Sequence, residues 1–267
     1  MLLDGKQLAG FIKQRHADQV RSFEHAARLP RLRVISCEQE VVSSKYADIK
    51  QQYGRDIGVS VDVETVTASD LTAAIRRNNQ DTSVHGIVAQ LPLPAAVDSD
   101  AVLSGIVSYK DVDALSGNAD FLPPTPNAIL WLLSGYNIDI TNKTVGVIGQ
   151  GRLVGQPLTR MLHESGQEPL TCDIDNGDYR QVLNTADVII SATGQAGLIR
   201  SADIPSGVVV VDGGTSSEFG ALVGDVEPTA YERDDITISP VPGGVGPLTV
   251  CALFENLLAA FISQELV

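Results

Sequence analysis

The sequence is poor in cysteine, in basic residues and in long apolar runs. Its three cysteines, Cys37, Cys172 and Cys251, lie far apart and form no C-x-x-C pair, which excludes a disulfide framework and fits a reducing cytoplasm. Only 19 Lys and Arg stand against 33 Asp and Glu, and the net charge of −14 argues against a general nucleic-acid binder, which needs a basic face. No stretch approaches ~18 apolar residues, so we expect no membrane span.

Signals for metal binding and for secretion are also missing. The four histidines, His16, His25, His85 and His163, are scattered without ligand spacing, so we expect no metal site. The first ten residues, MLLDGKQLAG, lack a basic region followed by an apolar run, so we expect no signal peptide. A length of 267 residues predicts about two domains.

Apolar runs typical of strands alternate with amphipathic segments typical of helices, in two sets. The proline-rich stretch FLPPTPN at residues 121–127 separates the sets and predicts a domain boundary. The alternation predicts an α/β fold with two α/β units. Predicted strands lie at 32–37, 59–66, 84–90, 144–148, 168–172, 188–191, 207–212 and 236–239, and predicted helices at 5–28, 43–57, 71–78, 128–135, 179–185 and 248–264, with a further helix after the glycine turn at 149–155.

The stretch TVGVIGQGRLVGQP, residues 144–157, is a β-branched run that breaks into a glycine turn and leads into an amphipathic helix. In this context glycines make a tight turn, let the backbone approach a pyrophosphate and let the helix pack on the strand, and the helix N-terminus offers N–H groups to phosphate. The spacing G-x-G-x-x-x-G is one residue longer than the commonest fingerprint, so glycines that only turn the chain are the alternative. The predicted cofactor contacts of this loop are Gly149, Gln150, Gly151, Arg152, Leu153 and Val154.

Acidic residues follow the next predicted strand, where such units often place a carboxylate on the ribose 2′-hydroxyl. Asp173 and Asp175 would repel a 2′-phosphate, so they favour NAD over NADP; a solvated loop acid is the alternative. Arg152 and Arg160 keep NADP open if either reaches that phosphate. Later strands end in small-residue turns that let backbone approach a flat cofactor, and the candidates there are Thr193, Gly194, Gly214 and Thr215.

Tyr46 and Lys50 lie four residues apart on one predicted helix and share a face, which Ser43 extends. A lysine in an apolar cleft can have a lowered pKa and act as an acid or base, and a tyrosine ring can stack on a flat substrate. An ordinary exposed helix pair is the alternative. Gln90, at a strand end, could hold the lysine ammonium. Asp113 is a further candidate site residue, and a turn or capping role is its alternative.

Four motifs in this order resemble the bifunctional methylenetetrahydrofolate dehydrogenase/cyclohydrolase family. Residues 43–50, SSKYADIK, are similar to its S-x-x-Y-V-x-x-K helix, and residues 88–94, VAQLPLP, to its V-Q-L-P-L-P strand end. Residues 110–113, KDVD, with PPTP at 123–126, resemble K-D-V-D-G and P-C-T-P. Residues 240–249, PVPGGVGPLT, nearly match the C-terminal signature, which GDV at 224–226 precedes.

The resemblance implies two α/β domains flanking a cleft: a folate-binding catalytic domain, residues 1–120 plus 248–267, and a Rossmann-like NAD(P)-binding domain, residues 121–247. It implies oxidation of 5,10-methylenetetrahydrofolate to the 5,10-methenyl compound with NAD(P), and hydrolysis of that compound to 10-formyltetrahydrofolate. Lys50 would be the acid/base, positioned by Gln90; Tyr46 would stack on the aminobenzoyl ring, Asp113 would hold the pterin, and the loop with Pro242, Gly243 and Gly244 would close the cleft. A homodimer is also implied.

The cofactor loop departs from the family pattern. The usual G-R-S-x-x-V-G reads GQGRLVG here, and the usual His-Ser/Arg-x-Thr after the second strand reads Asp173-Ile174-Asp175-Asn176. Both changes indicate that this enzyme uses NAD, or that it uses NADP poorly. Two alternatives stay open: an enzyme with one activity only, such as a cyclohydrolase with weak or lost dehydrogenase, and a non-catalytic folate- or nucleotide-binding protein.

Overall fold

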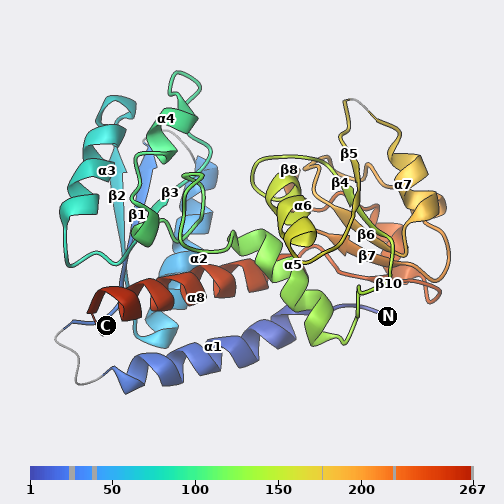
Figure 1. The fold of residues 1–267 in the computed structure, drawn as a ribbon, viewed down its shortest axis with the longest axis horizontal. Coiled ribbons are helices and arrows are strands. Elements are labelled where there is room, and N and C mark those ends of the chain that lie inside the picture. Colours follow the sequence, from blue (N-terminus) through green and yellow to red (C-terminus); the bar gives the residue numbers. More distant parts are fainter. Residues whose placement is uncertain (24–27, 38–40, 176, 219–220, 266–267) are drawn as a thin grey trace. The chain divides into compact units, whose positions relative to one another are not determined.

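The computed structural model describes residues 1–23, 28–37, 41–175, 177–218 and 221–265, with backbone alone for 41–45, 217–218 and 221. The chain folds as two compact units (Figure 1). Unit 1 comprises Met1–Gly10 and Thr125–Thr249, and unit 2 comprises Phe11–Pro124 and Val250–Val267. Helices α1 (Gly5–Ser22) and α8 (Val245–Glu265) each contain residues of both units.

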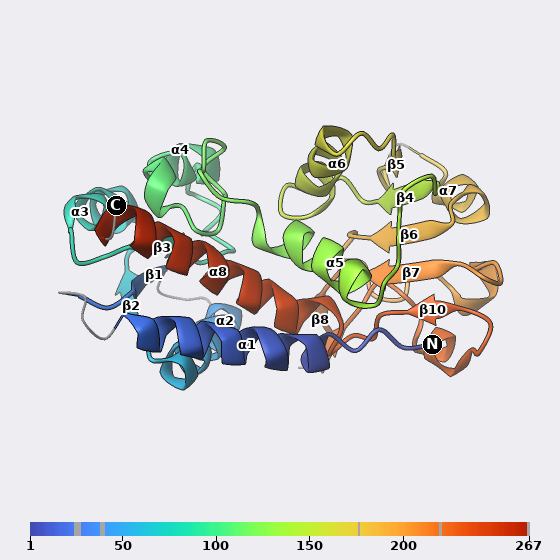
Figure 2. The ribbon, with the colours of Figure 1, turned by 60° about the horizontal axis from the view of Figure 1, so that its bottom comes forward.

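Unit 2 is built on a parallel three-stranded sheet of order β2-β1-β3. Alternate residues of these strands face opposite sides. Ile35 and Ile87 pack with α3, whereas Gly86 faces Leu257 of α8, so helices cover both faces of the sheet. Figures 1 and 2 show α1 and α8 side by side. The elements are β1 (Arg31–Cys37), α2 (Val41–Ile57), β2 (Ser60–Val66), η1 (Ala68–Asp70), α3 (Leu71–Gln80), β3 (Gly86–Ala89), α4 (Ser99–Leu103) and η2 (Ser108–Lys110).

Unit 1 contains a parallel five-stranded sheet of order β10-β7-β6-β4-β5. Figure 2 shows β4, β6, β7 and β10 one below another. The strand that follows β4 in the chain pairs on one side of it and the next strand pairs on the other side, so the strand order reverses between β4 and β6. Ligands of open α/β sheets bind outside the carboxyl ends of the strands at such a point. The elements are α5 (Pro124–Gly135), β4 (Val145–Ile148), α6 (Gly155–Glu164), β5 (Leu170–Cys172), α7 (Tyr179–Thr185), β6 (Val188–Ser191), η3 (Ser201–Asp203), β7 (Val209–Asp212), β8 (Ser216–Glu218), β9 (Ala221–Val223), η4 (Pro228–Glu232) and β10 (Thr237–Ile238).

Three local expectations need correction. The proline-rich stretch 121–127 is not wholly a break in regular structure, because α5 begins at Pro124. A helix tolerates proline in its first turn, since the N–H groups there have no intrahelical partner. The antiparallel pair β8 and β9 was missed because its strands are three residues each, too short for an alternating pattern to register. The helix predicted over 5–28 ends at Ser22, and residues 24–27 lie outside the described part.

Helix α8 bears on the expectation that the chain has no membrane span. By length and composition alone Val245–Glu265 could cross a membrane, but 61% of its most apolar window is buried. Two aromatic rings of α8 pack on other parts of unit 2. The ring centroid of Phe254 lies 4.6 Å from that of Tyr53, and the ring centroid of Phe261 lies 4.9 Å from that of Phe23. These contacts make α8 a core helix of unit 2, and core helices of soluble proteins satisfy the same length and composition test.

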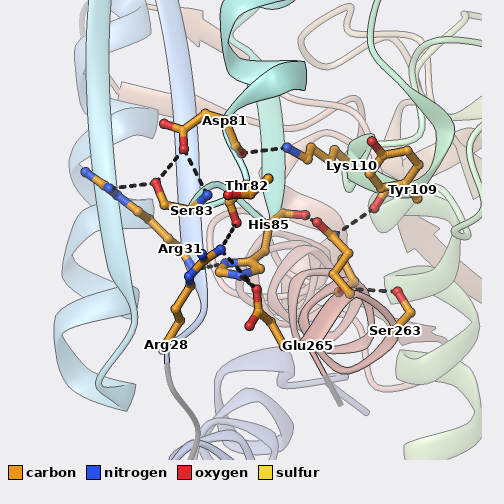
Figure 3. Close-up of polar contacts among 12 residues, drawn as sticks. Arg28, Arg31, Asp81, Thr82, Ser83, His85, Tyr109, Lys110, Ser263 and Glu265 are labelled. Carbon is orange, nitrogen blue, oxygen red and sulfur yellow. Dashed lines mark hydrogen bonds and ion pairs between the residues drawn. The ribbon is translucent and has the colours of Figure 1, made fainter. Parts of the chain in front are cut away.

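A polar cluster at the amino ends of β1 and β3 ties the last turn of α8 to unit 2 (Figure 3). His85 accepts the backbone N–H of Arg31 through Nδ1 (3.1 Å), and its Nε2 lies 3.4 Å from Oε1 of Glu265. Burial lowers the pKa of His85. Lys110 points into the same region and donates to the carbonyl of Asp81 (2.8 Å) and to those of residues 78 and 79. The lysine of the KDVD stretch therefore closes the end of α3 and fixes where that stretch begins.

Candidate functional site

The candidate residues of unit 2 centre on one hydrogen bond between a lysine and an amide. Lys50, on α2, donates from Nζ to Oε1 of Gln90 at 2.7 Å. Gln90 is 8% exposed and follows β3, and its own Nε2 donates to the carbonyl of Leu91 at 3.0 Å. The second bond fixes the amide orientation, because only Oε1 can accept and only Nε2 can donate. The structure thus brings together two of the predicted residues, with the amide oxygen held toward the lysine.

Burial shapes the charge of this group. It lowers the pKa of Lys50, and the nearby Asp113 carboxylate opposes that shift. Burial also raises the pKa of Asp113; the Lys50 charge opposes this and the Asp111 charge adds to it. A lysine whose ammonium is poorly solvated gives up its proton more readily, which suits it to proton transfer. Lys50 is therefore not the ordinary exposed lysine that was the alternative.

Asp113 lies in a tight turn whose hydrogen bonds come from Asp111. The carbonyl of Asp111 accepts the N–H of Ala114 (3.2 Å), and its Oδ2 accepts the N–H of Ser116 (2.7 Å). Ala114 adopts φ 55°, a left-handed conformation in which the family's usual glycine is strain-free. A β-bridge between Asp111 and Ile87 ties the turn to β3, the strand that ends at Gln90. The capping role considered for Asp113 thus belongs to Asp111, a fully buried residue that the sequence reasoning did not single out.

The remaining unit 2 candidates lie on α2. Tyr46 is 39% exposed, so its ring is available to a ligand rather than part of the core. Four residues on, Lys50 shares its helix face, as predicted. Ser43 belongs to the same helix, and its side chain lies outside the described part of the structure.

In unit 1 the glycine turn lies where the strand order reverses. Gly149 adopts φ 90° and a Cβ there would meet the carbonyl of Ala192, so the β4 and β6 loops touch. At Gly155 a Cβ would overlap the carbonyl of Gly149, which is why the first turn of α6 needs glycine to pack on the loop. Gly151 has no neighbour within 4 Å of a Cβ position. Two glycines therefore serve the fold, and the middle one leaves the loop open, as a pyrophosphate site requires.

The other residues of the loop differ in direction. Gln150 turns inward: its Oε1 accepts the hydroxyl of Thr159 on α6 (3.3 Å) and its Nε2 donates to the carbonyl of Gly149 (3.3 Å). Arg152 and Leu153 are exposed, whereas Val154 is half-buried just before α6. The side chain at the family's arginine position thus bonds to the loop backbone and to α6.

The acids after β5 are solvent-facing. Asp173 and Asp175 are both exposed, and Oδ1 of Asp173 accepts the N–H of Ile174 (2.9 Å). Since β5 pairs directly with β4, these carboxylates follow the strand beside the glycine loop.

Two buried carboxyls support the small-residue turns after β6 and β7. Asp225 accepts the N–H of Thr193 and the hydroxyl of Ser191, both at 2.6 Å, and Asp212 accepts the N–H of Gly214 at 3.1 Å. Gly194 and Thr215, the neighbours of these anchored residues, are exposed. The sequence reasoning placed Asp212 at a strand end and Asp225 in a motif without giving either a role. The signal available in the sequence was an acid, Asp212, at the end of the apolar run GVVVVD.

The proline–glycine loop of unit 1 is held by the N-terminal segment. Gly244 donates to the carbonyl of Pro240 at 2.7 Å, and the N–H of Lys6 donates to the carbonyl of Gly243 at 3.1 Å. Gly243 adopts φ 118°, which side chains rarely tolerate. Gly243 and Gly244 are buried, whereas Pro242 is exposed. Of the three predicted substrate contacts here, Pro242 alone presents a side chain to solvent.

Comparison with protein families accounts for both sets of residues. "Tetrahydrofolate dehydrogenase/cyclohydrolase, catalytic domain" matches residues 3–113, and "Tetrahydrofolate dehydrogenase/cyclohydrolase, NAD(P)-binding domain" matches residues 123–265. The chain belongs to the tetrahydrofolate dehydrogenase/cyclohydrolase family. The resemblance predicted from the four motifs is confirmed, and with it the two-domain α/β fold, the enzyme class and the paired dehydrogenase and cyclohydrolase function.

Relatives match over nearly the whole chain. The bifunctional protein FolD of Staphylococcus saprophyticus is 34% identical over 97% of this chain and 96% of its own length. The crystal structure of the bifunctional FolD methylenetetrahydrofolate dehydrogenase/cyclohydrolase of Campylobacter jejuni superposes with a TM-score of 0.91, 34% identity and 99% coverage of both chains. FolD of Trypanosoma brucei, complexed with NADP and an inhibitor, gives 0.91 at 30% identity, covering 98% of this chain and 97% of its own. A nicotinamide nucleotide is the coenzyme class named by the matching NAD(P)-binding domain and by the Trypanosoma brucei complex.

The glycine loop of this family member yields a test of the packing argument. Gly155→Ala should destabilise unit 1 by about 2 kcal/mol or more, because its methyl group would overlap the Gly149 carbonyl in a close-packed site. Gly151→Ala, in the same loop, should change stability by less than about 0.5 kcal/mol, because the added methyl meets nothing. Denaturant unfolding of both variants measures the difference; equal stabilities would contradict the assignment of Gly155 to helix–loop packing.

Proposed function

We propose that Lys50 is the acid/base of the cyclohydrolase step of this enzyme and that Gln90 is its positioning residue. The observation that carries the proposal is the 2.7 Å bond from Nζ of Lys50 to an amide oxygen whose orientation is itself fixed. An amide accepts the ammonium without adding charge, so burial can keep the pKa of Lys50 below its ordinary value. A non-catalytic binder has less use for such a lysine.

The two reactions place different demands on the chain. A bound nicotinamide nucleotide supplies a hydride acceptor for the methylene carbon that bridges two folate nitrogens. Hydrolysis then requires water to attack the methenyl carbon, loss of a proton from that water and delivery of a proton to the departing nitrogen. Lys50 can serve these proton transfers in turn, neutral when it accepts and charged when it donates.

Three further groups are proposed to bind the folate. Tyr46, partly exposed on the same helix face as Lys50, would stack on the aminobenzoyl ring. Asp113 would accept hydrogen bonds from the pterin, for which its turn holds it in place. Ser43 and the loop residues Pro242, Gly243 and Gly244 are proposed as further substrate contacts on the family resemblance.

We propose NAD as the preferred coenzyme. Gln150 stands at the family's arginine position and bonds to Gly149 and to Thr159 of α6, so no guanidinium is present there to pair with a 2′-phosphate. Asp173 and Asp175 are exposed after β5 and would repel that phosphate while accepting from a ribose hydroxyl. The Trypanosoma brucei relative binds NADP, so this choice would distinguish the two proteins. The proposed contacts are the loop residues 149–154, the two acids, Thr193, Gly194, Gly214 and Thr215.

The domain assignment and setting are also proposals. Residues 1–120 with 248–267 would form the folate-binding catalytic domain and residues 121–247 the nucleotide-binding domain. We further propose a cytoplasmic homodimer without nucleic-acid or membrane partners, on the family resemblance, the acidic charge and the sparse cysteines.

Removing the ammonium tests the role of Lys50. Lys50→Met should lower kcat for hydrolysis of 5,10-methenyltetrahydrofolate by about 10³-fold or more, because the proton-transfer group is lost while an unbranched side chain remains. Lys143→Met, at an exposed lysine, is the matched control and should leave the rate unchanged. Loss of the methenyl absorbance measures hydrolysis. Wild-type rates in the Lys50 variant would remove it from the mechanism.

Steady-state kinetics with both coenzymes tests the NAD assignment. kcat/KM should be higher with NAD than with NADP, and Asp173→Asn combined with Asp175→Asn should raise kcat/KM for NADP about tenfold, or ~1.4 kcal/mol, by removing repulsion. Asp234→Asn, at an exposed acid elsewhere in unit 1, controls for net charge. A strong NADP preference of the unaltered enzyme would refute the assignment.

A further inference from the structure

Asp212 and Asp225 are two acids in the core of unit 1 that the proposed chemistry does not use. They are 1% and 0% exposed, respectively. Asp212 is the last residue of β7, and Asp225 follows β9. Carboxyls are rarely buried without a cationic partner. Within the described residues, no Lys, Arg or His donates to either carboxyl, and the hydrogen-bond partners of both are neutral.

The two acids approach each other around two glycines. A Cβ on Gly214 would overlap the Asp225 carboxyl, and the N–H of Gly214 donates to Oδ1 of Asp212, so both acids meet at this residue. A Cβ on Gly224 would overlap Oδ2 of Asp212. The backbone N–H of Asp225 itself donates to Oδ1 of Asp212 at 3.1 Å. Both glycines are therefore required for two acids to approach in the core.

The donors are distributed unequally between the two acids. Asp212 accepts three backbone N–H groups, from Gly214 and Asp225 through Oδ1 and from Val226 through Oδ2 at 2.9 Å. Asp225 accepts Ser191 and Thr193 through Oδ2 alone, and its buried Oδ1 has no hydrogen-bond partner within the described residues. Two adjacent buried carboxylates cannot both stay ionised without a large cost, so one carries a proton. Of the four carboxyl oxygens, Oδ1 of Asp225 is the one without a hydrogen-bond donor among the described residues, so a proton shared by the pair displaces no hydrogen bond there.

We propose that Asp212 and Asp225 share one proton and act as positioning residues for the coenzyme, holding the turns after β6 and β7 in one arrangement. The proposal rests on the proposed function, in which Thr193 and Gly214 belong to the nucleotide site. Asp225 anchors the first turn through Thr193, and Asp212 anchors the second through Gly214. Neither carboxyl needs to touch the coenzyme to set the distance between the two turns.

The charge state of the pair should then reach the coenzyme. Burial and the Asp225 charge raise the pKa of Asp212 to about 7, against the three backbone N–H groups that lower it. The Asp212 charge also acts on Tyr231 of η4. Burial is the larger cause that raises the pKa of Tyr231, and the negative charge of Asp212 is the second. As pH rises through about 7 the shared proton leaves, the two carboxylates repel and the turns loosen. Nucleotide affinity should therefore fall on the alkaline side.

Amide substitutions distinguish the two acids. In Asp225→Asn the amide oxygen can keep both bonds of Oδ2, and the NH₂ group takes the place of the protonated Oδ1, so the variant mimics the protonated pair. In Asp212→Asn one acceptor becomes a donor facing a backbone N–H, so at least one anchor is lost. Asp225→Ala removes the anchors of Thr193 and Ser191 outright. Asp234→Asn, exposed, is the matched control.

The experiment measures the Kd of the full-length enzyme for NAD and for NADP at about pH 6 and about pH 8.5. The wild type and Asp234→Asn should bind the preferred coenzyme about threefold or more weakly at the higher pH, whereas Asp225→Asn should bind with wild-type low-pH affinity at both. Asp212→Asn and Asp225→Ala should raise Kd about tenfold or more at both pH values. At each pH, cyclohydrolase kcat/KM, which requires no nucleotide, should stay within about twofold of the wild-type value in every variant, a split that general unfolding would not produce.

Infrared difference spectra report the shared proton without any coenzyme. The spectrum of the wild type minus that of Asp225→Asn should show a buried carboxylic-acid band at low pH, which is lost on the alkaline side; the subtraction removes any band from Asp113. Absence of that band in the wild type, wild-type pH dependence of Kd in Asp225→Asn, or equal Kd values for Asp225→Asn and Asp212→Asn would each overturn the proposal. A wild type that shows the band but binds neither coenzyme would instead overturn the proposed nucleotide site.

Discussion

The hydrogen bond between Lys50 and Gln90 is the interaction on which the proposed chemistry of unit 2 depends. A buried ammonium needs an acceptor, but a carboxylate in that place would stabilise the charge and hold the proton. The amide of Gln90 accepts without adding charge, and its orientation comes from the Leu91 carbonyl. Asp113 supplies a negative charge nearby, and burial raises its pKa as well. The lysine can therefore exist in both charge states at a fixed position, which proton transfer requires.

Unit 1 solves a different problem, because it must bring backbone close to a large, flat, charged coenzyme. Glycine permits this at the carboxyl ends of β4 and β7, where a Cβ would meet the next loop or a buried acid. The buried carboxyls of Asp225 and Asp212 then hold the turns after β6 and β7 by accepting the backbone N–H groups of Thr193 and Gly214, respectively. Hydrogen bonds within the core thus set the positions of these turns. The exposed side chains of the glycine loop and of the β5 end are the ones proposed to select between NAD and NADP.

Most of the strands and helices could be predicted, because strands such as β4 and β6 are buried β-branched runs and the helices have clear apolar faces. The pairing of Lys50 with Gln90 was also predictable, since helical spacing and a strand end place both. Local patterns could not give the hydrogen bonds that cross between elements: the capping of the KDVD turn by Asp111, or the meeting of Asp212 with Asp225. The three-residue strands β8 and β9 were too short to alternate visibly.

The central claim is that burial against a neutral amide keeps Lys50 readily deprotonated. Carbon-13 NMR of the enzyme after reductive methylation of its lysines, with the Lys50 signal assigned by its absence in Lys50→Met, measures this pKa directly. The account predicts a midpoint below the ordinary lysine value of 10.5, because desolvation outweighs the opposing charge of Asp113. A midpoint at or above 10.5 would contradict it, because Lys50 would then be a fixed cation that binds substrate without moving its proton.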